Sequence, residues 1–157
     1  MPPDVSLVLD FLNTLDVEED VDTLASAGRW HAWTHERELP ADPPDEVRPV
    51  RDALRAAVGD PAARPGPARA AVEVALTERG PELVTSSAVG AVLAAAARLA
   101  VLGEWERVKI CPADNCHWAF YDRSRNRSRT WCSMKVCGNR EKARAFRERT
   151  AAEPPER

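Results

Sequence analysis

The sequence predicts a mainly α-helical protein in which a helical N-terminal domain precedes a small C-terminal module that a metal ion holds together. Apolar residues recur at helical spacing through the N-terminal two thirds, and all four cysteines lie in the last third. The 157 residues, 44% hydrophobic and 30% charged, suffice for one compact domain and a small metal-stabilised one. The longest apolar run, 88–102, contains Arg98 and is too short to span a bilayer. We therefore expect a cytoplasmic protein without a membrane partner.

Two stretches of the N-terminal part carry apolar side chains at the three- and four-residue spacing of one helix face. The first stretch is Val8, Phe11, Leu12 and Leu15, and the second is Val47, Val50, Leu54 and Val58. The second stretch runs into Gly59-Asp60-Pro61, and glycine followed by proline is typical of a helix end. Both stretches therefore predict amphipathic helices.

Capping and breaking residues place another helix between these two. Asp22 or Ser26 can cap it, because short polar side chains accept hydrogen bonds from the free N–H groups of a first turn. This helix carries Trp30 and Trp33, and the proline-rich segment 40–44 separates it from the next one.

The remainder of the N-terminal part predicts two further helices and a strand. The alanine-rich segment 68–79 favours a helix that ends at Gly80. Residues 82–85 predict a short strand. A serine at position 86 or 87 caps a long helix that runs to Leu102.

From residue 107 the pattern changes. Residues 107–110 alternate polar and apolar side chains, as a strand does, and Trp118, Phe120 and Trp131 suit packing across a hairpin. Lysine, arginine, alanine and glutamate favour a helix from about 134 to 149. A cysteine knuckle, a hairpin and a helix form the layout of a treble-clef-like finger. We expect a helical domain over 1–104, a finger over 105–149 and a disordered tail over 150–157.

The four cysteines form two matched pairs, Cys111-x4-Cys116 and Cys132-x4-Cys137, with fifteen residues between the pairs. Two close pairs suit a tetrahedral zinc ion, so we predict one structural Zn²⁺ per chain. Four thiolates leave no position for an activated water, and we expect no enzyme activity. Two disulfides are the alternative, but they need an oxidising compartment and the sequence shows no targeting segment.

Basic residues concentrate around these cysteines. Residues 107–149 hold twelve Lys and Arg against four Asp and Glu, whereas the rest of the chain has a net charge of −11. This asymmetry predicts that the finger binds DNA, because guanidinium groups offer paired donors to phosphates. The predicted nucleic-acid-binding residues are Arg123, Arg125, Arg127, Arg129, Lys135, Arg140, Lys142, Arg144 and Arg147.

Other functions remain open on the same residues. The finger could instead be an RNA-binding or protein-interaction module, in which aromatic rings either stack on unpaired bases or form the finger's own core. A metal-dependent nuclease would use His117 together with Asp122 or Asn126 at a second metal site. The sequence indicates no oligomeric state.

Polar residues on the first helix are candidates for a second site. Asp10, Asn13 and Thr14 share a helix face beside the apolar one, and we assign them to a candidate pocket for a small-molecule effector. Alternatively, such groups bond the backbone ends of neighbouring elements. The acidic segment 16–22 could compete with DNA for the arginine-rich segment 123–129.

The segment from Cys111 to Arg140 resembles the CGNR zinc finger, named for its ending, which here is Cys137-Gly138-Asn139-Arg140. The opening Leu7-Val-Leu-Asp-Phe-Leu-Asn-Thr14 is similar to the start of the ABATE domain that precedes this finger in bacterial proteins. The resemblance implies a stress-induced bacterial transcription regulator with a DNA-binding finger.

Overall fold

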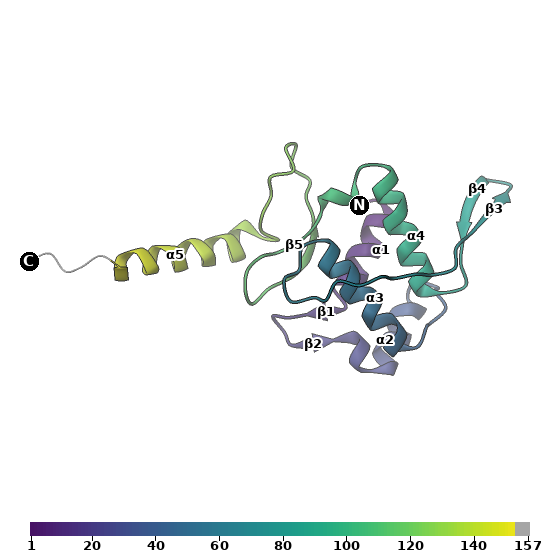
Figure 1. The fold of residues 1–157 in the computed structure, drawn as a ribbon, viewed down its shortest axis with the longest axis horizontal. Coiled ribbons are helices and arrows are strands. Elements are labelled where there is room, and N and C mark those ends of the chain that lie inside the picture. The colour runs from purple at the N-terminus through teal and green to yellow at the C-terminus, as the bar shows by residue number, and fades with distance from the viewer. Residues whose placement is uncertain (153–157) are drawn as a thin grey trace, which may run out of the picture.

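The computed structural model describes residues 1–152 of the chain. Its helices are α1 (Pro3–Leu12), α2 (Ala27–His35), α3 (Pro44–Ala57), α4 (Ala88–Val101) and α5 (Asn139–Ala152). Its strands form antiparallel pairs, β1 (Leu15–Asp16) with β2 (Val21–Asp22), β3 (Glu73–Thr77) with β4 (Gly80–Val84), and β5 (Val108–Ile110) with β6 (Ala119–Tyr121). Helices α1 to α4 gather in a body from which α5 extends (Figure 1). The predominance of helices agrees with the prediction.

The core of this body lies where α1 packs on α4. The buried face of α1 carries Val8 and Phe11, as their spacing predicts, and the ring of Phe11 meets Trp30 of α2 edge-on at 6.3 Å. Leu15 of the same predicted stripe lies in β1 instead, because α1 ends at Asn13. Small alanine side chains on the buried face of α4 let the two helices approach closely.

Side-chain caps fix where the helices begin. The two alternative caps of the second helix both act: Asp22 accepts from Leu24 N–H at the start of a short 3₁₀ turn, and Ser26 caps α2. Ser87 accepts from Gly90 N–H and caps α4. After α4, Gly103 adopts a positive φ of 69°, a conformation that glycine adopts without strain.

The predicted helix over 68–79 is wrong. Its second half is β3, which pairs with β4 in a hairpin that projects from the body (Figure 1). Valine and leucine at 72, 74 and 76 alternate with other residues, which is a strand pattern, and here it outweighs the high helix propensity of alanine, because propensity is only a weak determinant of structure. Thr77 bonds the turn at both Arg79 N–H and Gly80 C=O, and Gly80 supplies a φ of 111°. The strand predicted over 82–85 is confirmed for 82–84, which belong to β4, whereas Thr85 lies just after it.

Strands β5 and β6 join the finger to the body. Val108, Ile110 and Ala119 belong to the same buried cluster as α1 and α4. A second, smaller cluster surrounds the cysteines and contains Phe120, with Trp131 packed against it. The hairpin therefore contributes to the core of the body, and the predicted division after residue 104 stays a prediction.

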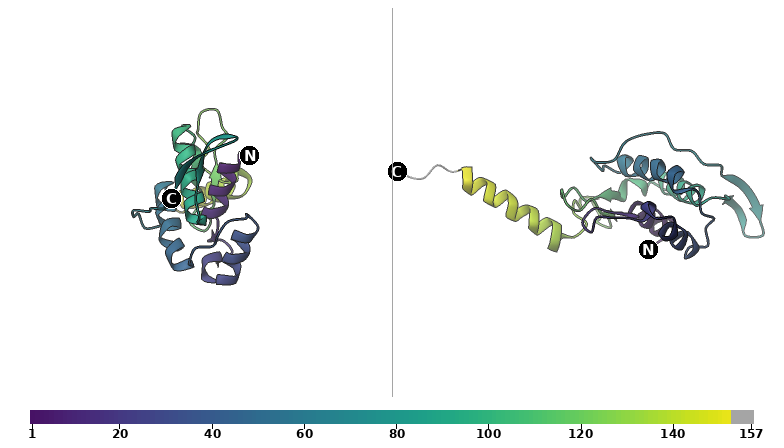
Figure 2. Two further views of the ribbon diagram at one scale, coloured as in Figure 1. Left: turned by 90° about the vertical axis from the view of Figure 1, so that its right-hand side faces the viewer. Right: turned by 90° about the horizontal axis from the view of Figure 1, so that it is seen from below.

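Helix α5 leaves the body in a direction of its own (Figure 2). A π-helical turn, Met134–Gly138, precedes it, so the predicted helix begins at the expected place. It continues through 150–152, which the sequence assigned to the tail, while 153–157 lie outside the described residues. Across residues 1–152, no helix combines the length and apolar character that crossing a membrane requires.

Candidate metal centre and nucleic-acid interface

The four cysteine sulfur atoms converge on one point. All four Sγ atoms lie within 4.8 Å of one another, and Cys132 Sγ is 3.5 Å from Cys116 Sγ and 3.6 Å from Cys137 Sγ. Four sulfurs placed about 2.3 Å from one zinc would stand about 3.8 Å apart, whereas a disulfide requires about 2.05 Å. The thiols are free, and their arrangement fits a tetrahedral Zn²⁺ site.

Local structure delivers each ligand. Cys111 follows β5 directly, Cys116 ends the turn before β6, and Cys137 lies in the π-helical turn that Ser133 caps through Val136 N–H. A Cβ at Gly138 would lie 2.5 Å from Met134 Sδ, so a larger residue there would require the Met134 side chain to move. The segment between β5 and β6 thus supplies Cys111 and Cys116. Cys132 lies just before the π-helical turn, and Cys137 lies within it.

The environment of the thiols favours a metal over free thiolates. Burial raises the pKa of Cys116 to about 11, and burial together with the neighbouring thiols raises the pKa of Cys132. At Cys111 burial also opposes ionisation, but hydrogen bonds from the Cys132 and Ala113 backbone lower the pKa overall. A dication in their midst would offset the cost of burying several thiolates.

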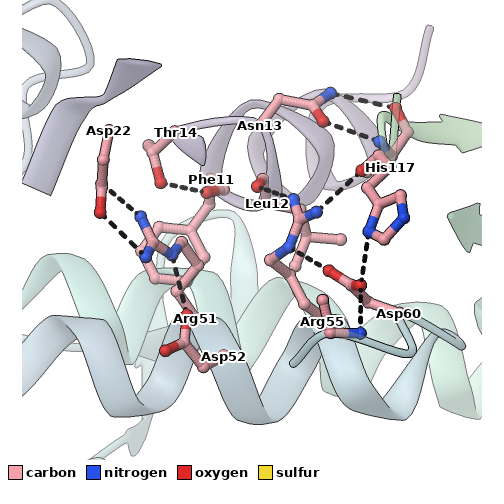
Figure 3. Close-up of polar contacts among 12 residues, drawn as sticks. Phe11, Leu12, Asn13, Thr14, Asp22, Arg51, Asp52, Arg55, Asp60 and His117 are labelled. Carbon is pink, nitrogen blue, oxygen red and sulfur yellow. Dashed lines mark hydrogen bonds and ion pairs between the residues drawn. The ribbon is translucent and has the colours of Figure 1, made fainter. Parts of the chain in front are cut away.

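Two polar side chains of the body hold the first cysteine knuckle in place (Figure 3). The Asn13 amide donates to Ala119 C=O at 3.0 Å and accepts from Ala119 N–H at 2.8 Å. Arg55 is fully buried and donates to Leu12 C=O and to His117 C=O, each at 2.8 Å. His117 needs this support, because it adopts a positive φ of 49°.

A buried acid completes this junction. One carboxylate oxygen of Asp60 accepts a hydrogen bond from Arg55 Nε at 2.7 Å. The other oxygen lies 3.0 Å from His117 Nδ1. The sequence analysis assigned no role to Arg55 or Asp60. The signal was present, since Arg51 and Arg55 both continue the predicted apolar stripe of α3 at helical spacing. A charged residue in such a stripe must find a buried partner.

The three residues assigned to an effector pocket are placed differently from one another. Asp10 is half-exposed and pairs with Arg37 at 3.0 Å. The side-chain amide of Asn13 is hydrogen-bonded to the backbone of Ala119. Thr14 is buried, and its hydroxyl donates to Phe11 C=O at 2.7 Å. Asp10 and Asn13 line a cavity of about 370 Å³ between α1 and the finger, whereas Thr14 does not. The effector assignment stays a prediction.

The predicted arginine segment forms a loop after β6, which we call the arginine loop (residues 123–129). The carboxylate of Asp122 organises it by accepting from Lys109 Nζ at 2.7 Å, Ser124 N–H at 2.8 Å and Arg129 N–H at 2.9 Å. Burial alone would raise the pKa of Asp122, but Lys109 and these N–H groups hold it well below its ordinary value. The start and the end of the loop are thereby fixed to β5.

The arginines of the loop differ in whether their guanidinium groups are already bonded to other groups of the protein. Arg127 pairs with Glu106 and donates to Gly103 C=O at 3.1 Å. Arg129 donates to the Trp131 and Cys132 carbonyls and lies 4.9 Å over the ring of Phe120. Arg123 and Arg125 are exposed and form no ion pair within residues 1–152. These two are the arginines most accessible to a phosphate.

The basic residues of the C-terminal segment divide in the same way. Arg140 pairs with Glu18 at 2.9 Å, and Arg144 pairs along its own helix with Glu141 and Glu148. Lys135, Lys142 and Arg147 are exposed and unpaired in the described part of the chain. The acidic segment thus touches α5 at Arg140, whereas it was expected to face the arginine loop.

Two family models match the chain. The model of the CGNR zinc finger matches residues 107–150. The ABATE model, described as a putative stress-induced transcription regulator, matches residues 6–119. A comparison with curated proteins gave no match. The chain therefore belongs to the ABATE family and carries a CGNR zinc finger behind its ABATE domain.

Proposed function

We propose that the protein is a stress-responsive transcription regulator whose zinc finger binds duplex DNA through the arginine loop and α5. The exposure and the positive charge of α5 are the observation that supports this proposal most directly. From 142 to 151 its residues are exposed apart from the half-buried Ala145, and the helix has five basic and two acidic side chains. A solitary helix of this length is marginal in water, which indicates that it acts against a partner. Its charge suits a polyanion.

The dimensions and anchoring of α5 also fit a groove. An α-helix with its side chains is about 10–12 Å across, and the major groove of B-DNA is about 12 Å wide. Cys137 lies one turn before α5, so a zinc ion would fix the helix relative to the arginine loop. The ion pairs of Arg144 within the helix are exposed surface pairs, which contribute little to stability, so phosphates can replace them at little cost. We retain the treble-clef layout as part of this proposal.

A protein-interaction module is the second candidate, and it has an observation of its own. Phe146 on α5 is 63% exposed, and Met134 and Val136 before it are each 49% exposed. Apolar side chains in this position suit a protein groove. The nuclease alternative has less support, because His117 faces Asp60 and the carboxylate of Asp122 is taken up by the loop. We propose a non-enzymatic role.

Fluorescence anisotropy with duplex DNA, single-stranded DNA and RNA of equal length tests the proposal. If about five phosphates are contacted, log K on duplex DNA should fall with log salt at a slope of about −4.5. Arg125→Ala should flatten the slope by about one, and Arg147→Ala should do the same. Arg79→Ala is the matched control, because Arg79 is exposed at the turn of the β3–β4 hairpin. Equal binding of all three nucleic acids, or an unchanged slope in both variants, would contradict the proposal.

A further inference from the structure

The cavity of about 370 Å³ lies where α1 meets the finger, beside the arginine loop. Helix α1 contributes Asp10 and Asn13 to its lining, and the finger contributes Trp118, Arg123 and Arg129. The sequence predicts an effector role for Asp10 and Asn13 and nucleic-acid contacts for Arg123 and Arg129. The fold brings both groups to one cavity, whose volume falls within the roughly 300–1,000 Å³ of small-molecule sites.

The cavity offers a binding group for an anion. Arg123 is exposed and unpaired within residues 1–152, so its guanidinium can turn its paired donors towards a phosphate or a carboxylate. Arg129 adds a second positive charge to the lining, although its own donors already bond the carbonyls of Trp131 and Cys132. An anionic group therefore finds one free guanidinium and one fixed one.

The same cavity offers an aromatic surface. The ring of Trp118 is 38% exposed, whereas Phe120 two residues later is buried in the small cluster. The backbone around Trp118 is held on both sides, because Arg55 binds His117 C=O and Asn13 binds both polar groups of Ala119. Trp118 C=O itself accepts from Cys111 N–H at 2.9 Å. The indole is thus attached to a rigid frame, which lowers the entropy cost of stacking a planar ring on it.

A third group sets the orientation. The carboxylate of Asp10 is half-exposed and lines the cavity while it pairs with Arg37. It repels an anion, so the charged end of a ligand must lie towards Arg123. It can accept a hydrogen bond from a ring N–H or amino group at the other end.

We propose that this cavity binds a small planar aromatic compound that carries an anionic group. The ring stacks on Trp118 and the anion pairs with Arg123, and Asp10 accepts a hydrogen bond from a polar group in those ligands whose ring carries one. Both a nucleoside monophosphate and an aromatic carboxylate have this chemistry. A ligand bound in this way occupies Arg123 and so weakens DNA binding; this last consequence alone rests on the proposed function.

Calorimetric titration of the full-length zinc-bound protein, without DNA, tests the proposal. The probes are AMP and 2-naphthoate, with adenosine as the aromatic control without charge and ribose 5-phosphate as the anionic control without a ring. AMP or 2-naphthoate should bind at least about tenfold more tightly than both controls, a difference of about 1.4 kcal/mol. Preference for AMP identifies a nucleotide site, and preference for 2-naphthoate identifies a site for aromatic acids. No binding of either, or ribose 5-phosphate binding as tightly as AMP, overturns the proposal.

Variants locate the site. Trp118→Leu and Arg123→Gln should each weaken binding of the preferred probe about fivefold to tenfold, and Arg125→Gln should leave it unchanged. Arg125 lies in the same loop but does not line the cavity, so it controls for the loss of one charge. Zinc content and melting temperature establish that each variant is folded. Equal losses in Arg123→Gln and Arg125→Gln would reveal unspecific attraction and overturn the site. Because no DNA is present, a failure of DNA binding leaves this result intact.

Discussion

Arg55 on α3 donates a hydrogen bond of 2.8 Å to the carbonyl oxygen of His117, the residue that directly follows Cys116. The two residues are 62 positions apart in the chain, and both are buried. The same guanidinium binds Leu12 C=O at the end of α1 and the carboxylate of Asp60. One side chain therefore connects two helices of the body to the cysteine knuckle, and body and finger should be coupled in stability.

Arg55→Met tests this coupling. Removing the charge deprives the buried Asp60 of its guanidinium partner, which should cost about 3–5 kcal/mol of unfolding free energy. Because the knuckle also loses its support, zinc affinity in a chelator competition should fall about tenfold. Arg48→Met is the control, since Arg48 is 41% exposed and should cost about 1 kcal/mol or less. Equal unfolding free energies for the two variants would refute the special role of Arg55.

Removal of a zinc ligand should affect the finger unevenly. In Cys132→Ser we expect loss of the metal and loss of hydrogen-exchange protection in 133–152, because this segment contacts the rest of the chain chiefly around the cysteines. The amides of β5 and β6 should remain protected, since Val108, Ile110 and Ala119 are buried in the core of the body. Metal analysis and exchange measured by mass spectrometry provide the readouts. Wild-type protein treated with a zinc chelator should give the same pattern, and loss of protection in β5 would contradict it.

The ion pairs of Asp22 predict a defined pH dependence. Burial alone would raise the pKa of Asp22, but Arg51 and Arg48, together with Leu24 N–H, lower it below its ordinary value. A lowered pKa contributes stability that is complete above the unfolded value of about 3.9 and is lost as the pH falls below it. Asp22→Asn should therefore cost about 3 kcal/mol of unfolding free energy at pH 7, because it leaves the buried Arg51 with Asp52 as its one remaining carboxylate partner within residues 1–152.

The difference between this variant and the wild type should stay constant down to about pH 5 and narrow below about pH 4. Denaturant unfolding at several pH values measures it. Asp20→Asn, an exposed neighbour in the same segment, should change stability by less than about 0.5 kcal/mol at every pH. A difference that widens in acid would show that the pKa of Asp22 is not lowered.

The contact between Glu18 and Arg140 predicts a modest restraint on DNA binding. Glu18→Gln removes a surface pair of 2.9 Å and frees the first arginine of α5 for phosphate. Duplex affinity at low salt should rise by no more than about fivefold, because exposed surface ion pairs are weak. The gain should shrink as salt rises, because screening weakens the ion pair. Glu19→Gln makes the same charge change next to it, so equal gains in both variants would assign the effect to net charge instead.

Local patterns in the sequence determined much of this protein. The spacing of Val8 and Phe11 determined α1, the serines at 26 and 87 determined where α2 and α4 begin, and the cysteine spacing identified the four residues of the metal site. Each of these signals depends on residues close together in the chain, where helical period, capping and ligand spacing act directly.

The tertiary structure decided what depends on distant partners. The Asn13 side chain bonds a backbone 106 residues away, and only the folded chain distinguishes this role from a ligand site. The place of Arg55 on the apolar stripe of α3 indicates burial, but only the folded chain shows that α1 and the knuckle supply its hydrogen-bond partners. Likewise, the arginines of the loop are equivalent in the sequence but differ in their ion pairs. Arg127 pairs with Glu106, whereas no residue within 1–152 forms an ion pair with Arg125. Burial and charge pairing are properties of the assembled fold, so a sequence supplies the groups while their neighbours determine what each one does.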